Sequence, residues 1–152
     1  MTVYTTAGTT IAVSASAPAT YDSAGYAALT YTAIGEVTDL GEFGREYALV
    51  THNPIGTRAT QKYKGSYNEG AITLAVGLDT DDAGQDLLTT ASTSDSNYSF
   101  KITAQNGDVY YFPAKVMSFK RQFGSVDQIT TGAITLEITS SSAGVGVVIV
   151  EA

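Results

Sequence analysis

The chain has 152 residues, a net charge of −7 and no cysteine. This length suffices for one domain with a hydrophobic core. Eight basic against 15 acidic residues argue against tight nucleic-acid binding, because proteins that neutralise phosphates are basic. The lack of cysteine excludes disulfides, thiolate catalysis and Cys-ligated zinc.

The composition is typical of a β protein, because ten tyrosines and many threonines suit a pleated surface. Met1 is followed by neither a basic stretch nor a long apolar run, so we expect no signal peptide and no membrane anchor. We expect one domain over 1–152, with an N-terminal arm at 1–20 and a C-terminal tail at 141–152, made in the cytoplasm of the producing cell.

Alternating apolar and polar residues predict short strands in chain order. The predicted strands are 10–16, 30–37, 47–52, 57–64, 71–79, 97–104, 108–116 with a continuation to 123, and 131–140. One helix is predicted at about 80–92, with Asp79 or Thr80 as its cap and acidic residues near its positive end. This pattern favours a mainly β sandwich or barrel with one flanking α-helix.

Three local signals refine this prediction. Asn106-Gly107 predicts a type I′ turn, in which both central residues have positive φ. Pro113 indicates a sheet edge or a bulge. The apolar stretch 144–150 predicts an edge strand that pairs either with its own sheet or with another subunit.

The stretch of about 41–70 is too long and too polar to be a simple connection. Asn53-Pro54-Ile55-Gly56 predicts a turn. The following strand, 57–64, alternates so that its basic residues share one side. We therefore expect a long hairpin arm with polar faces, which needs a partner surface because an isolated hairpin is unstable in water.

Nothing in the chain predicts catalysis, and we expect no enzyme, no cofactor and no metal. His52 is the only histidine, and no Gly-x-Ser-x-Gly motif accompanies it. The acids at 79–86 lack the pattern of a calcium loop and are explained by helix capping. A glycosidase with two paired carboxylates stays an alternative, because such residues come together in the folded protein and need no fixed spacing in the sequence. The lack of tryptophan argues against sugar binding.

An ordered series of short motifs runs through residues 9–140. The motifs are Pro18-Ala-Thr-Tyr-Asp22, Ile34-Gly-Glu-Val37, Leu40-Gly41, Thr51-His52, Gly65, Glu69-Gly-Ala-Ile-Thr-Leu74, Asp81-Asp82, Leu87-Leu88, Phe123-Gly-Ser-Val-Asp127 and Ile134-Thr-Leu-Glu-Ile-Thr139. In order and spacing the chain resembles the tail tube (major tail) proteins of long non-contractile-tailed phages of the lambda type and the related tubes of gene-transfer particles.

The resemblance implies a virion protein that forms hexameric rings stacked into a tail tube, through which DNA passes to the host without specific binding. It implies contacts with the tape measure, tail tip and terminator proteins. Some members of this family add a C-terminal immunoglobulin-like domain, which we expect to be absent here. A tail terminator or secretion-type tube protein is the close alternative, and a small glycan-binding β-sandwich module is the other.

The resemblance places the hairpin arm against the neighbouring ring. The expected contact residues are Glu42, Arg45, Glu46, His52, Asn53, Pro54, Ile55, Arg58, Lys62, Lys64 and Glu69. Opposite charges among them offer complementarity between copies, which sets register more than affinity. Asp127 and Glu137 are candidate acids of the lumen, where negative charge would repel DNA phosphates.

Overall fold

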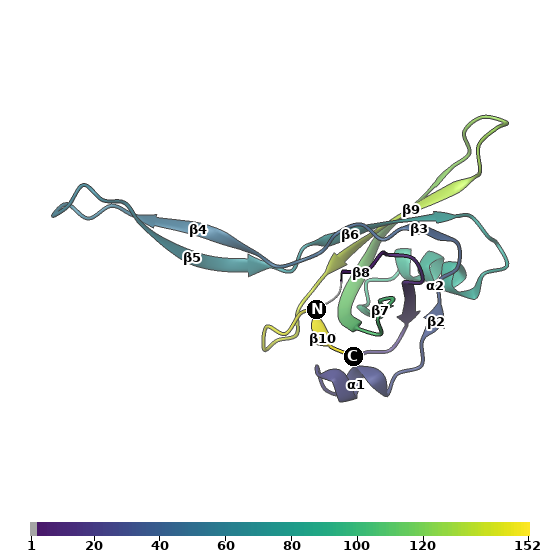
Figure 1. Ribbon diagram of the computed structural model, residues 1–152, viewed down its shortest axis with the longest axis horizontal. Coiled ribbons are helices and arrows are strands. Elements are labelled where there is room, and N and C mark those ends of the chain that lie inside the picture. Colours follow the sequence, from purple (N-terminus) through teal and green to yellow (C-terminus); the bar gives the residue numbers. More distant parts are fainter. Residues whose placement is uncertain (1–2) are drawn as a thin grey trace.

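One antiparallel sheet forms the body of the protein, as seen in a computed structural model that describes residues 3–152. Its strand order is β2-β1-β7-β8-β9-β6-β3, and β10 pairs with the start of β8. The sheet curls around a helix, α2, and a separate two-stranded sheet projects from the body (Figure 1). The body strands are β1 (Thr10–Ser14), β2 (Thr32–Ala33), β3 (Val37–Asp39), β6 (Ala71–Gly77), β7 (Tyr98–Thr103), β8 (Val109–Gln122), β9 (Thr131–Ile138) and β10 (Val148–Val150).

The core lies on the concave side of this sheet. In β6, Ile72, Leu74 and Val76 are buried, whereas the residues between them are exposed or half-buried. The same alternation holds in β9, which pairs with β6 along its whole length. Because side chains of a strand point to opposite faces in turn, one face of the sheet is apolar and faces α2. The mainly β prediction is confirmed.

Helix α2 (Ala83–Ser92) fills the inside of the curl with Leu88 and Ala91, which are fully buried. It starts three residues later than predicted, because Asp82 is the N-cap. The Asp82 carboxylate accepts hydrogen bonds from the Gln85 N–H (2.9 Å) and from the Gly35 N–H (3.1 Å). One acid therefore caps the helix and fixes the β2–β3 connection against it.

A second helix, α1 (Ser23–Ala27), was not predicted, so the prediction of one helix is wrong. Asp22 caps it by accepting a 2.8 Å hydrogen bond from the Gly25 N–H. Tyr26 is fully buried and stacks on Tyr111 of β8 at 5.4 Å between ring centroids. Five residues carry too little periodicity for a sequence pattern to reveal, and an aromatic stack holds the helix on the sheet.

Two predicted details of the backbone are wrong. The expected strand 30–37 is broken into β2 and β3, and between them Glu36 has a φ of 59°. In the β7–β8 hairpin only Gly107 has positive φ, and its N–H donates to the Ala104 carbonyl (3.0 Å). The turn therefore starts at Ala104, and Asn106 does not adopt the type I′ conformation.

Pro113 lies neither on an edge strand nor at a bulge. Strands β9 and β10 pair with different parts of β8, and Pro113 falls in the gap between them. Its carbonyl accepts from the Thr139 N–H (3.0 Å), just beyond the end of β9. The missing N–H of proline thus costs no ladder bond. The bulge of β8 lies between Val116 and Ser118.

The apolar C-terminal stretch pairs with the chain's own sheet, through β10 and β8. Within residues 3–152, neither helix has the length and apolar character that crossing a bilayer requires. Met1, the first residue of the expected N-terminal arm, lies outside the described residues.

Candidate functional site: the protruding arm and its root

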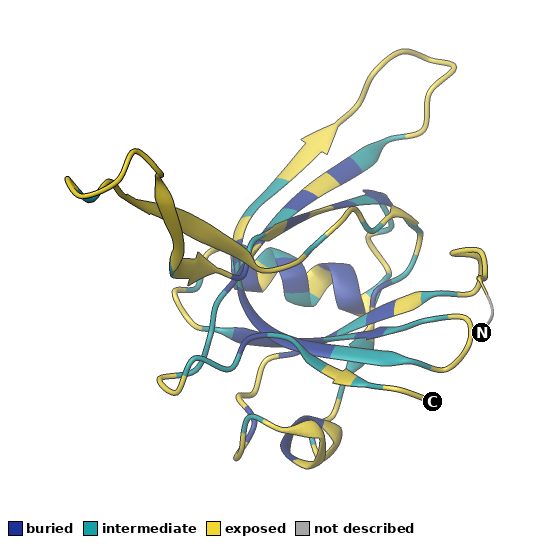
Figure 2. Cartoon of the chain, turned by 60° about the vertical axis from the view of Figure 1, so that its left-hand side comes forward, coloured by how far each residue is buried: buried dark blue, intermediate teal, exposed yellow. Residues whose placement is uncertain are grey.

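The predicted hairpin arm is present and projects far from the body (Figure 1). It consists of β4 (Glu46–His52) and β5 (Gln61–Asn68), which pair with each other as a separate sheet. Nearly every residue of both strands is exposed (Figure 2). A two-stranded hairpin in water is at best marginally stable, so we expect the arm to pack against another protein surface.

The tip of the arm differs from the prediction. The turn is closed by the Thr57 N–H, which donates to the Pro54 carbonyl at 3.4 Å, one residue later than expected. Strand β5 begins only at Gln61, so Arg58 lies in the tip loop and not on a strand. The tip also presents Ile55, whose side chain is completely exposed.

The two faces of the arm are not wholly polar as predicted, because each also carries apolar or aromatic side chains. Leu49 pairs with Lys64, and on the same face Tyr47 pairs with Tyr67. Val50 pairs with Tyr63 on the opposite face. All of these apolar or aromatic side chains are exposed, Leu49 by 66% and Val50 by 47%.

Two side-chain contacts confirm how the residues divide between the faces. The Lys64 ammonium lies 4.7 Å from the centre of the Tyr47 ring, so these two share a face. The Tyr63 hydroxyl donates to Gln61 Oε1 at 2.9 Å on the other face. Between the pairs Tyr47–Tyr67 and Leu49–Lys64, a bulge adds one residue to β5. Lys64 and Tyr67 therefore lie on the same face although they are three positions apart.

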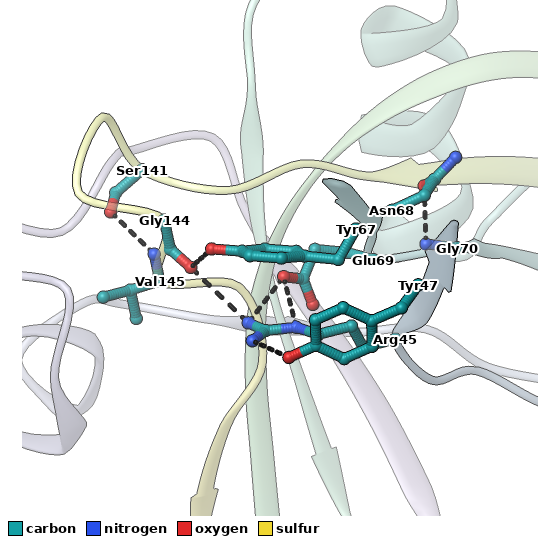
Figure 3. A network of polar contacts seen from close by, with 9 residues as sticks. All are labelled: Arg45, Tyr47, Tyr67, Asn68, Glu69, Gly70, Ser141, Gly144 and Val145. Atoms are coloured by element: carbon teal, nitrogen blue, oxygen red, sulfur yellow. Dashed lines mark hydrogen bonds and ion pairs between the residues drawn. The ribbon is translucent and has the colours of Figure 1, made fainter. Parts of the chain in front are cut away.

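The root of the arm is held by an ion pair. Arg45 precedes β4 and Glu69 follows β5, so the antiparallel pairing places them opposite each other. The Arg45 guanidinium donates to Glu69 Oε1 from Nε (3.0 Å) and from Nη2 (2.7 Å) (Figure 3). The Glu69 side chain is only 6% exposed, and therefore needs these donors.

Aromatic and backbone groups complete the root (Figure 3). The guanidinium lies 3.9 Å from the centre of the Tyr67 ring, and the Tyr67 hydroxyl donates to the Gly144 carbonyl at 3.0 Å. Arg45 also donates to the Tyr47 hydroxyl at 3.4 Å. Its hydrogen bonds to Tyr47 and then to Glu69 raise the pKa of Arg45, which stays charged.

The root therefore joins the arm to the segment before β10. Gly144 has a φ of 83°, and its N–H donates to the Ser141 carbonyl at 2.9 Å. Gly146 is buried directly against the Glu69 carboxylate, where a side chain would overlap it. The arm's direction thus depends on a short loop near the C-terminus, far away in the sequence.

The other predicted contact residues lie along the arm, except Glu42. Glu42 precedes the root, Glu46 begins β4 opposite Asn68, and His52 ends β4 opposite Gln61. Lys62 and Lys64 lie on β5, and Asn53 and Pro54 lie in the tip loop. Arg45 and Glu69 find their partners within the chain. Contact with another copy stays a prediction for the whole set.

The two candidate lumen acids do not form one site. Asp127 lies in the exposed loop between β8 and β9, before β9 begins. Glu137 lies near the other end of β9, on the outer face, where it pairs with Ala71 and Lys115. A lumen role for either acid stays a prediction.

Sequence reasoning missed a second protrusion at the β8–β9 loop (Figure 2). Phe123, Val126 and Ile129 are exposed there by 69%, 97% and 80%. The continuation of the strand was expected to reach 123, but β8 ends at Gln122, so Phe123 belongs to the loop. Among residues 3–152, no three His, Asp or Glu side chains gather so that they could hold a metal ion.

No family model and no curated protein matches the chain. Among solved structures, a chain of the extracellular contractile injection system PVC, from a structure of its sheath/tube terminator in the extended state, shares the fold with a TM-score of 0.70. The identity is 11%, and the match covers 99% of each chain. A chain of the anti-feeding prophage (AFP) baseplate matches with a TM-score of 0.67 and 9% identity, over 92% of this chain and 94% of that one. The fold is thus one found in components of phage-tail-like injection particles.

Proposed function

We propose that the chain is a structural component of a phage-tail-like particle that joins copies of itself and other tail proteins. The observation that carries the proposal is the projecting arm, with exposed apolar side chains on both faces, on a body that shares its fold with two such components. A monomer would gain nothing from such an arm, whereas an assembly would bury it.

The finer proposal is a tail tube of stacked hexameric rings that conducts DNA in a long non-contractile tail of the lambda type. It rests on the ordered motifs of the sequence. The protein would act without catalysis or cofactor, in the virion tail, alongside tape measure, tail tip and terminator proteins. A contact that does not close on itself generates an open filament, which is the geometry of a tube.

Electron microscopy of the purified protein over a range of concentrations tests this proposal. We expect rings and tubes. A variant whose residues 53–64 are replaced by a short Gly-rich turn should keep a folded body and form no tubes, because the distal arm is gone. A protein that stays monomeric at every concentration, with and without tail-tip proteins, contradicts the proposal.

The second candidate is a tail terminator, because one solved relative comes from a sheath/tube terminator structure. A terminator closes a tube and so need not polymerise. The same micrographs separate the two roles: single rings or short stacks indicate a terminator, and long tubes indicate the tube subunit.

A further inference from the structure

The two faces of the arm carry different residues, yet both expose large apolar or aromatic side chains among polar ones. One face presents Leu49, Tyr47 and Tyr67, and the other presents Val50 and Tyr63. Leu49 and Val50 are neighbours in β4 and therefore point in opposite directions. We call these the Leu49 face and the Val50 face.

A single flat contact covers only one of these faces. A hairpin laid on a surface packs one side against it and leaves the other in water, as in a sheet with one solvated face. The residues on the solvated side of such a hairpin are then mostly polar. Neither side of the arm is wholly polar, since Tyr63 on the Val50 face is 55% exposed and Leu49 on the other face is 66% exposed.

The charge of the arm indicates what covers it. Residues 46–68 contain three cations and one acid, Glu46, and so carry +2 of the chain's net −7, which leaves −9 on the rest of the chain. The cations are Arg58, Lys62 and Lys64. A basic arm and an acidic body are complementary in different copies of the same chain, whereas two arms repel each other.

We propose that the arm inserts into a crevice between two further copies of this chain, so that one copy covers the Leu49 face and the other covers the Val50 face. This inference rests on the proposed function, because it specifies the surface through which copies join. Each arm then ties together three subunits, and the acceptor is complete only where two copies already stand side by side.

Cysteine labelling tests the proposal directly, because the chain has no native cysteine. Leu49→Cys and Val50→Cys form a matched pair, one on each face and one residue apart. Each variant is mixed at low proportion with wild-type protein, assembled, and treated with an uncharged maleimide, and the labelling rate is compared with that of the unassembled mixture. We expect both sites to react about tenfold or more slowly after assembly, since a covered site reacts only in a minor open state.

A second measurement covers the case in which a cysteine itself hinders assembly. Each variant is labelled with a bulky maleimide first, and its incorporation into wild-type tubes is measured by sedimentation. We expect both labelled variants to be excluded. Retained reactivity at one position, or normal incorporation of one labelled variant, shows an arm lying flat on a single copy and overturns the inference. Retained reactivity at both positions shows that copies of this chain do not cover the arm. If wild-type protein forms no assembly at all, it is the proposed function that fails.

Discussion

The substitution Gly146→Ala is expected to destabilise the root of the arm. A Cβ at position 146 would lie 2.7 Å from Glu69 Oε1, and closer still to the carboxylate carbon and to Oε2. Ordinary contacts begin near 3.5 Å, so the carboxylate must retreat by about 1 Å. The carboxylate thereby leaves the position from which Glu69 Oε1 accepts the 2.7 Å hydrogen bond of Arg45 Nη2.

The magnitude follows from the lack of free space. The Glu69 side chain is 6% exposed, so the carboxylate has little room in which to move. Overpacking of this kind costs about 1–3 kcal/mol of the free energy of unfolding. For a chain of this size the loss corresponds to a fall in Tm of about 2–12 °C.

Urea denaturation followed by circular dichroism, at a concentration below assembly, measures the loss. Gly44→Ala is the matched control, because nothing lies within 4 Å of a Cβ at that nearby glycine. The decisive experiment repeats Gly146→Ala in a Glu69→Ala background, where the obstacle is gone. There the cost of Gly146→Ala should nearly vanish, giving a coupling energy of about 1–3 kcal/mol. Costs that add to within about 0.5 kcal/mol refute the steric argument.

Three further predictions concern the arm, the core and a helix cap. Reversing the charges of the arm's cations should weaken assembly more at low salt than at high salt, as measured by sedimentation, because exposed charges are screened; an equal effect at all salt concentrations indicates packing instead. Leu88→Ala should lower the free energy of unfolding by about 2–5 kcal/mol, since the residue is fully buried in α2, whereas the exposed Thr90→Ala on the same helix should change it by less than about 0.5 kcal/mol. The hydrogen bond from the Gly25 N–H holds the pKa of Asp22 below its usual range, so its stabilisation is present above a pH of about 4 and is lost as the pH falls toward the folded-state pKa. The difference in urea midpoint between wild type and Asp22→Asn should therefore narrow between pH 7 and pH 3.

The sequence predicted those parts of the fold in which side-chain alternation is regular. Strands β6 and β9 repeat buried and exposed residues without interruption, and both were found within two residues of their bounds. The hairpin arm was also predicted, because a proline-containing turn separates two strand-forming runs. In these segments local pattern and tertiary packing agree, and the fold class follows from them.

The remaining features of the fold could not be predicted from the sequence, because they depend on contacts between residues that are far apart in the chain. Helix α1 exists through a stack of Tyr26 on Tyr111, which are 85 positions apart in the chain. The bulge in β8 places both Val116 and Phe119 on the core side of the sheet, which simple alternation does not allow for residues three positions apart. Gly146 has no sequence signature of its role, since only the folded root places it against Glu69.

Part of the candidate site could have been predicted more fully. The charges at the two ends of the arm were noted as partners for another copy. Arg45 and Glu69 flank the two strands of one hairpin, so an antiparallel register alone brings them together. The apolar residues of the arm were present in the sequence as well, but the basic residues between them suggested a polar surface.

The connection between arm and body has a mechanical consequence. Only Glu69 and Gly70 separate the end of β5 from the start of β6, and in Figure 1 the two strands follow one line. Tension on the arm therefore enters β6 along its axis, where seven residue pairs bind it to β9. The ladder's hydrogen bonds run perpendicular to the strands, so such a load acts in shear and must break many of them together instead of unzipping them one by one. A particle built from such subunits would resist being pulled apart along the direction of its arms more strongly than it would resist peeling.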